Sequence, residues 1–491
     1  MVFSSWPFIF VFLPVTLLVY FQLNRARRTV LGKAWLVLAS LFFYAYWNWV
    51  HLPLILVSIG LNFLLGRRLA RWPAGGDLRH KRRWLIAGIA ANLLALAYYK
   101  YIHFITENLS WLWGLPVQMD PVVLPLAISF FTFTQIVYLV DSYRGETGHY
   151  DLLNYALFVT FFPHLIAGPI VQHSQIMPQF NSRWTWLPRE SNLVKGLLLF
   201  GLGLFKKVAI ADVFAVWADA GFDGTGPLDL VGAWVASLSY TFQLYFDFSG
   251  YCDMAMGVAL LFNIWLPINF NSPYRATSIQ DFWRRWHITL SHFLRDHLYI
   301  PLGGNRAGRW RTHLNLVITF ALGGLWHGAS WMFVIWGLLH GLALVVHRLW
   351  GGLGWRMPRA LAWGLTFLFV NVAWVFFRAK DWDSARRVLA GMVDFSSLRA
   401  VPLADVPTEA LAWSGWLGDA LLRTMPAQLV AHLPALLMIA LAFCIVPRPN
   451  AIHWATTGVT DAKVVAGTLV LVAALVATLA STSSVFLYFN F

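Results

Sequence analysis

The chain has 491 residues, of which 59% are hydrophobic and only 12% are charged. Soluble domains carry about 25% charged residues, so this composition excludes an ordinary soluble protein and indicates an integral membrane protein. The formal net charge of +14 does not indicate nucleic-acid binding, because Lys and Arg cluster in short loops between apolar runs, as topology determinants and lipid contacts do.

Apolar runs follow one another along the whole chain. A membrane-spanning helix needs about 20 mostly apolar residues. The opening MVFSSWPFIFVFLP lacks the basic segment and cleavage site of a signal peptide, which predicts a retained first helix. No soluble domain interrupts the series, so we expect one membrane domain over residues 1–491. The predicted helices, some short enough to be re-entrant, are 5–22, 34–50, 52–66, 84–100, 121–140, 152–170, 193–217, 230–249, 250–267, 313–327, 328–348, 360–378, 433–447 and 463–483.

Basic loops predict the orientation in the membrane. The segments NRARR (24–28) and 67–83 are rich in Arg and are expected on the cytoplasmic side. This places the N-terminus outside, and counting onward places the C-terminus outside as well. The polar loop 269–312 then lies inside. The segment of about 381–432 lies outside, where its mixed composition predicts an amphipathic interfacial element.

Polar residues interrupt the apolar segment TFQLYFDFSGYCDMAMG at 241–257. Charged groups at membrane depth usually face the interior of the helix bundle, a cavity or a functional site. Two readings stay open for Asp247 and Asp253. They either pair with Arg side chains or cap a helix break at Gly250, or they line a functional cavity together with Gln243.

The stretch NFNSPYRATSIQDFWRRWHITLSHFLRDHLYIPLGGNR at 269–306 mixes aromatic residues with Arg and His. Ser278 and Asp281 form a predicted capping pair, and we expect one amphipathic helix through the DFWRRWHITLSHFLRDHLY segment that follows. Its Arg residues suit lipid phosphates or the phosphates of an anionic cofactor.

A metal reading of this region is disfavoured by spacing. His287, His292 and His297 are five residues apart, so on a regular helix successive members are rotated by about 140° and do not share a face. None of the 15 histidines forms the closely spaced pairs that membrane di-iron enzymes need. Cys252 and Cys444 offer no ligand or disulfide spacing either. We therefore expect no metal site.

A single histidine, His327, lies within the otherwise small and apolar stretch GGLWHGASW at 323–331. A neutral imidazole is a good general base near pH 7. The small neighbours Gly324, Gly328, Ala329 and Ser330 let another backbone or a substrate chain come close. The alternative is a core histidine satisfied by one hydrogen bond.

Taken together, these motifs resemble the membrane-bound O-acyltransferase (MBOAT) family, in particular its branch of alginate O-acetylases and related bacterial exopolysaccharide acetylases. The segments FFPHLIAGPIV (161–171) and WVFFRA (374–379) add to the resemblance, which covers the whole chain. It implies an all-α polytopic fold, a ring of about 11–14 transmembrane or re-entrant helices around a central tunnel, with the core motifs at 241–348. It also implies that His327 is the catalytic histidine and His287 its supporting partner.

The resemblance further implies that acetyl groups cross the membrane. The donor substrate would be an acyl thioester, acetyl-CoA, on the cytoplasmic side, with no bound cofactor. The acceptors would be a periplasmic partner of the SGNH-hydrolase type and, through it, a polysaccharide such as alginate. The residues expected along the tunnel or at the donor are Gln243, Asp247, Asn271, Arg284, Arg285 and Trp326.

Tyr488 lies in the final segment FLYFNF (486–491). This segment resembles the C-terminal motif of a small peptide of the D-alanylation system, which implies an acyl relay through Tyr488. The alternative is an aromatic membrane anchor.

Other functions stay open at this point. The same family chemistry can serve peptidoglycan, cellulose or teichoic acid. A transporter of polysaccharides or lipid-linked sugars belongs to a different class, and it would be expected to show a repeated half, which this sequence lacks.

Overall fold

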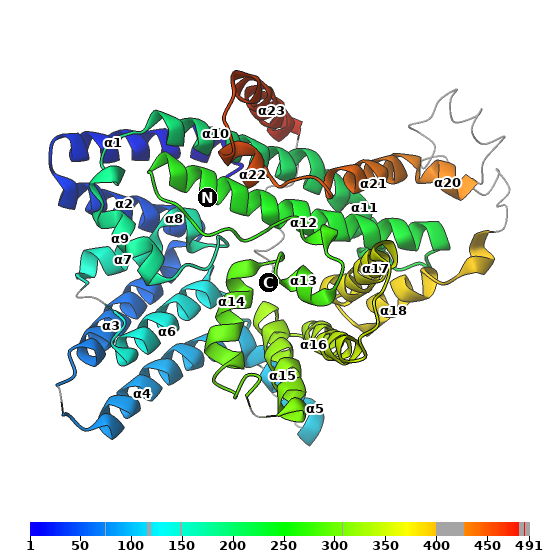
Figure 1. The fold of residues 1–491 in the computed structure, drawn as a ribbon, viewed down its shortest axis with the longest axis horizontal. Coiled ribbons are helices and arrows are strands. Elements are labelled where there is room, and N and C mark those ends of the chain that lie inside the picture. Colours follow the sequence, from blue (N-terminus) through cyan, green and yellow to red (C-terminus); the bar gives the residue numbers. More distant parts are fainter. Residues whose placement is uncertain are drawn as a thin grey trace.

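The described residues of the computed structural model form helices and connecting segments only, with no strand among them (Figure 1). The structure describes residues 1–73, 75–114, 119–147, 150–306, 308–398, 427–480 and 486. The predicted all-α class is therefore confirmed. Six helices within these ranges are long and apolar enough to cross a membrane: Pro7–Arg25, Trp49–Ala70, Leu78–Trp113, Trp331–Gly352, Arg359–Arg378 and Asp461–Leu479.

Most helices of the N-terminal part lie on the left of Figure 1, whereas α5 lies near α15 at the bottom. Two predicted spans are wrong here. The run 121–140 becomes helical only at Ile128, because Pro121 and Pro125 precede it. The run 152–170 contains only two short helices and then leaves helical structure. The elements are η1 (Pro7–Phe12), α1 (Leu13–Arg25), α2 (Thr29–Ala45), η2 (Trp49–His51), α3 (Leu52–Ala70), α4 (Leu78–Leu96), η3 (Ala97–Tyr101), α5 (Ile102–Trp113), α6 (Ile128–Arg144), α7 (Leu152–Thr160), α8 (Phe162–Leu165) and α9 (His173–Asn181).

One long helix, α12 (Leu230–Leu261), runs through the middle of the molecule (Figure 1). It packs against α10 (Glu190–Phe205) and α11 (Asp212–Asp223). The expected break between 230–249 and 250–267 is wrong, because the helix continues through Gly250. A Cβ atom there would lie 2.7 Å from the carbonyl oxygen of Gly203 on α10, so glycine serves close helix contact and not a turn.

The acidic residues of α12 pair with lysines and not with Arg. Asp247 lies 2.7 Å from the Lys207 ammonium, and Asp253 lies 2.5 Å from that of Lys206. Both lysines belong to a π-helical segment, η5 (Lys206–Ala211), between α10 and α11. Lys207 also pairs with Asp212 at 2.7 Å. These buried pairs join η5 and the first residue of α11 to the central helix.

The polar loop 269–306 contains a broken helix where we expected a continuous one. Ser278 accepts a hydrogen bond from the Asp281 backbone N–H at 3.1 Å, which confirms the predicted cap. The helix then ends after five residues, and the chain turns at His287, whose φ is +43°. The elements are η6 (Pro273–Arg275), α13 (Ile279–Trp283), α14 (Ile288–Leu294) and η7 (Arg295–Tyr299).

Helices α15 (Arg309–His327) and α16 (Trp331–Gly352) form a tight hairpin. A Cβ atom at Gly324 or Gly337 would lie 2.2 Å from a backbone carbonyl oxygen of the opposite helix. One at Gly328 would lie 2.1 Å from the Phe333 ring. Two roles were expected for these small residues, close approach of another backbone or of a substrate chain. In the hairpin they allow close approach of another backbone.

In the C-terminal part, α17, α18 and α21 contact α12, and α23 packs on α10. The predicted amphipathic segment 381–432 begins with a short helix, α18, whereas its residues 399–426 lie outside the described ranges. The elements are α17 (Arg359–Arg378), α18 (Trp382–Gly391), η8 (Phe395–Leu398), α20 (Ala427–Ala431), α21 (Leu433–Ile445), α22 (Ala451–Thr456) and α23 (Asp461–Ala480).

Candidate active site

The fold brings His327 and His287 together in the interior. Their ring centroids are 6.3 Å apart, although they come from different elements. His327 is the last residue of α15, and His287 immediately precedes α14. The side chains are 4% and 1% exposed, respectively. Two imidazoles so close and so deeply buried provide proton-accepting and proton-donating groups at one point of the bundle.

Aromatic rings surround His327. The ring centroids of Trp326, Trp336 and Phe377 lie 4.9, 5.2 and 5.2 Å from that of the imidazole. The indole N–H groups of Trp326 and Trp336 are buried and have no hydrogen-bond acceptor among the described residues. A buried donor left in this state costs about 1–3 kcal/mol, so these two N–H groups are suited to bind an oxygen atom of a substrate.

The tautomer of His287 follows from its contact with Asn269. The Asn269 Oδ1 atom lies 3.1 Å from His287 Nδ1 and also accepts from the backbone N–H and the hydroxyl of Thr289. Because Oδ1 is thereby identified as an acceptor, His287 Nδ1 must carry the proton. The Nε2 atom of the neutral ring is then an acceptor.

Backbone contacts hold His287 in its left-handed conformation. The N–H of Ile288 donates to the carbonyl of Asn269 at 3.0 Å, and the N–H of Asn271 donates to Arg285 at 2.9 Å. The Thr289 hydroxyl also accepts from the N–H of Ile170, which belongs to the FFPHLIAGPIV motif. A non-glycine residue at positive φ is uncommon and persists only when its surroundings determine it.

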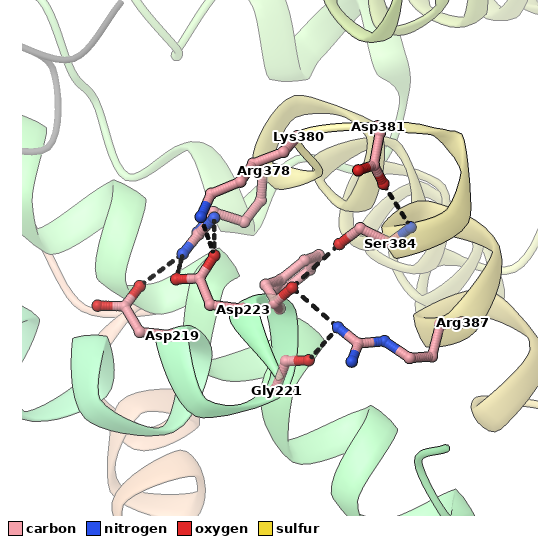
Figure 2. A network of polar contacts seen from close by, with 9 residues as sticks. Asp219, Gly221, Asp223, Arg378, Lys380, Asp381, Ser384 and Arg387 are labelled. Carbon is pink, nitrogen blue, oxygen red and sulfur yellow. Dashed lines mark hydrogen bonds and ion pairs between the residues drawn. The ribbon is translucent and has the colours of Figure 1, made fainter. Parts of the chain in front are cut away.

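An ion-pair network fixes the end of α17 beside the site (Figure 2). Arg378 directly follows Phe377, whose ring contacts that of His327. The Arg378 guanidinium lies 2.8 Å from Asp219 and 2.7 Å from Asp223, both on α11. Arg387 on α18 adds a hydrogen bond of 2.8 Å to the Phe222 carbonyl. The network therefore anchors one wall of the aromatic surroundings.

The other residues expected at the tunnel or the donor have surroundings of their own. Asp247 forms an ion pair with Lys207, and Gln243 is buried on α12. Asn271 is exposed, and Arg285 pairs with Asp281 at 2.9 Å. Of the residues named with His327 and His287, only Trp326 contacts both rings.

Arg284 instead lines a cavity of about 410 Å³ between α13–α14 and α15–α16. Arg295 and Arg348 line the same cavity, which gives it three cationic side chains. Neither catalytic candidate histidine belongs to its lining.

Metal binding has no support in the described part of the chain, where no group of three His, Cys, Asp or Glu side chains could hold an ion. The regular helix predicted through the three histidines of this region is wrong. His287, His292 and His297 do not lie on one regular helix, because the chain breaks before α14 and becomes π-helical after it.

Tyr488 lies outside the described residues. Phe486, two positions earlier, is described and is fully buried. Its ring centroid lies 4.6 Å from that of Tyr251 and 5.0 Å from the Lys207 ammonium. Phe486 therefore packs on the central helix α12.

Two residues near the site were not predicted. Asn269 was overlooked in favour of Asn271, since nothing in the sequence distinguishes the two asparagines of the NFN segment. Lys100 lies against the end of α15, and a signal for it existed, because it is an ionisable residue at the end of an apolar run.

Known proteins resemble this chain over part or all of its length. The profile of the MBOAT, membrane-bound O-acyltransferase family, matches residues 99–380. A peptidoglycan O-acetyltransferase of Helicobacter pylori is 46% identical over 100% of this chain and 98% of its own length. A probable alginate O-acetylase AlgI of Pseudomonas aeruginosa is 42% identical over 81% of this chain and 76% of its own. A teichoic acid D-alanyltransferase of Streptococcus thermophilus is 29% identical over 46% of this chain and 57% of its own.

Proposed function

Because the chain belongs to the membrane-bound O-acyltransferase family, as its motifs predicted, we propose that it O-acetylates a bacterial cell-surface polysaccharide. Its family makes it a multi-pass membrane acyltransferase, and the transporter alternative is therefore set aside. The observation that carries the proposal is the buried pair of His327 and His287. We place the protein in the inner membrane with both termini in the periplasm, as its basic loops predict.

Peptidoglycan is the polymer that the similarities favour. The relative named for peptidoglycan aligns with all of this chain at 46% identity, whereas the relatives named for alginate align with about four fifths of it. An exopolysaccharide such as alginate is the second candidate. In both cases we expect a periplasmic partner of the SGNH-hydrolase type to complete the transfer.

The proposed donor is acetyl-CoA, which carries phosphate groups. Arg284, Arg295 and Arg348 line one cavity in the region expected on the cytoplasmic side. Within the described ranges Arg295 pairs with Asp296, whereas Arg284 and Arg348 have no ion pair. Two uncompensated guanidinium groups at a cavity favour an anionic ligand.

Acyl transfer at the histidine pair proceeds in two steps. First, His327 accepts the proton of the acceptor hydroxyl while the hydroxyl oxygen attacks the thioester carbonyl carbon. The carbon–sulfur bond then breaks, and the proton passes to the leaving thiolate. The indole N–H groups of Trp326 and Trp336 stabilise the oxyanion between these steps. His287 orients the hydroxyl or His327 through Nε2, because its Nδ1 proton is engaged by Asn269.

Replacement of His327 tests the catalytic proposal. General-base catalysis contributes about 100-fold or more, so His327→Ala is expected to remove nearly all O-acetyl groups from the cell-surface polymer at a normal protein level. His453→Ala is the control, since His453 is an exposed histidine of α22. Wild-type acetylation in His327→Ala cells would reject the assignment. Comparing O-acetyl content of peptidoglycan with that of exopolysaccharide identifies the polymer.

The proposed relay through Tyr488 has a separate test. Tyr488→Phe keeps the aromatic ring and removes the hydroxyl that would carry the acetyl group. We expect acetylation of the polymer to be lost while acetyl-CoA binding is retained. Unchanged acetylation would leave the segment as an anchor only.

A further inference from the structure

Lys100 is an ionisable residue within a membrane helix that the proposed chemistry does not use. It belongs to η3, inside the 36-residue helix Leu78–Trp113. Its ammonium lies 2.6 Å from the Trp326 carbonyl oxygen, 3.1 Å from that of His327 and 3.3 Å from the Ser129 hydroxyl. Placing a charged lysine side chain within a membrane helix costs free energy, and such residues usually have a specific function.

The three acceptors match the three N–H donors of an ammonium group. Lys100 therefore has no donor left for a substrate oxygen. No described carboxylate forms an ion pair with it, so its contacts are to α15 and to Ser129 alone. These features point to a role in holding protein groups and not in binding the acyl group.

The protein groups it holds are those that end α15. The last four carbonyl groups of an α-helix have no partner within the helix. Here Lys100 satisfies two of them, and the Tyr101 hydroxyl donates to a third, that of Leu325, at 2.9 Å. A cation at a helix C-terminus also interacts favourably with the helix dipole. The turn that carries His327 is thus held from outside by two neighbouring side chains.

Lys100 and Tyr101 are consecutive residues of the π-helical segment η3 that reach one target. Side chains of adjacent residues on a regular α-helix diverge by about 100°. Single π-helical turns occur inside α-helices, frequently at functional sites. In η3 the residues Lys100 and Tyr101 both reach carbonyl groups of the same turn of α15.

We propose that Lys100 is a positioning residue for His327, which holds the last turn of α15 so that the imidazole keeps its place beside His287. This inference rests on the proposed role of His327 in acyl transfer. A displacement of about 1 Å at a reacting group can reduce a rate by about 100-fold, so loss of this hold is expected to lower kcat. The affinity for acetyl-CoA should not change when Lys100 is replaced, because none of its hydrogen-bond partners lines the cavity of Arg284, Arg295 and Arg348.

The test compares Lys100→Met with Lys33→Met in inverted membrane vesicles that enclose the periplasmic contents, including the proposed partner, together with peptidoglycan oligosaccharides. Radiolabelled acetyl-CoA is added from outside. Lys33 is a partly buried lysine of α2 that donates to Asn154 on α7 and to Asn181 on α9, and not to α15. We expect Lys100→Met to lower kcat by about tenfold to 100-fold with KM for acetyl-CoA within twofold of wild type. Lys100→Arg, which keeps a cationic donor, should recover part of the rate.

A double variant separates this inference from the proposed function. If Lys100 acts through His327, Lys100→Met should have no further effect in the His327→Ala background. Wild-type activity of His327→Ala would reject the proposed function. An inactive His327→Ala together with a fully active Lys100→Met would reject only the role of Lys100. A raised KM with normal kcat would also reject it.

Lys100→Gln keeps the test decisive if the Met variant does not fold. Its amide retains N–H donors but cannot satisfy all three acceptors. We expect a folded protein whose kcat is lower than those of the wild-type enzyme and Lys100→Arg. Its kcat should be higher than that of any Lys100→Met protein that does fold. A folded Lys100→Gln protein with wild-type kcat would overturn the proposal.

Discussion

At the scale of single residues, the contact between His287 and Asn269 defines which nitrogen of the supporting histidine carries the proton. Asn269 is fully buried and gathers three donors on one oxygen. We expect Asn269→Ala to lower kcat by about tenfold to 100-fold, as loss of an orienting partner does at comparable sites. The measurement is acetyl transfer from acetyl-CoA in inverted membrane vesicles that enclose the periplasmic partner.

Asn371→Ala is the matched control for this variant. Asn371 is also fully buried and bonds to Ser237 and Thr241 instead of a histidine. The two variants should lose similar thermal stability, while only Asn269→Ala loses activity. Equal activities would mean that the tautomer of His287 does not matter.

The sequence predicts the identity of the two histidines better than it predicts their support. His327 and His287 stand in distinctive motifs, so a resemblance can locate them. Asn269 and Lys100 act through contacts between residues distant in the chain, 18 positions in one case and 226 in the other. Such contacts have no local pattern, so the sequence does not distinguish Asn269 from Asn271. It marks Lys100 only as an ionisable residue at the end of an apolar run, without its partner.

At the scale of elements, the hairpin of α15 and α16 depends on glycines whose Cβ atoms would collide with the opposite backbone. We expect Gly337→Ala to destabilise the protein by about 1–3 kcal/mol, as overpacking does. Gly364→Ala on α17 is the control, because no heavy atom lies within 4 Å of the added Cβ. It should be neutral or stabilising, since Ala is the better helix former. Thermal unfolding midpoints in detergent measure both, and equal midpoints would contradict the packing.

The lysine pairs of η5 give a second prediction at this scale. Asp253→Asn leaves the Lys206 ammonium without its only described ion-pair partner, whereas Asp247→Asn leaves Lys207 with Asp212. Breaking a buried pair destabilises by about 3–5 kcal/mol, so Asp253→Asn should lower the unfolding midpoint more. A larger effect of Asp247→Asn would contradict this order.

Helix existence is predicted well from the apolar runs, whereas helix breaks are not. The sequence predicted a break at Gly250 and continuity through 281–299, and both were wrong. Gly250 is required by the approach of α10, and the break at His287 is required by backbone pairing with the segment 269–271. Tertiary contacts decide both cases, and local propensity carries no information about them.

At the scale of the whole molecule, the basic loops predict how the protein lies in the membrane. Helix α3 separates position 50, expected outside, from position 75 in the Arg-rich loop, expected inside. In a Cys444→Ser background, Gly75→Cys should resist a membrane-impermeant maleimide in spheroplasts, and Val50→Cys should react. Cys252 does not interfere because it is buried. The reverse labelling would invert the proposed orientation and the assignment of the donor side.

The buried position of Phe3 has a consequence for the biosynthesis of the protein. Its ring stacks on that of Tyr251 with centroids 4.9 Å apart, and Tyr251 in turn contacts Phe486. Phe3 thus packs on a partner that is made almost 250 residues later, and that partner packs on Phe486, which is made later still. The early helices can insert at once, but this part of the interior can close only after Phe486 has been made. Until then, nascent chains expose this aromatic surface to chaperones and proteases.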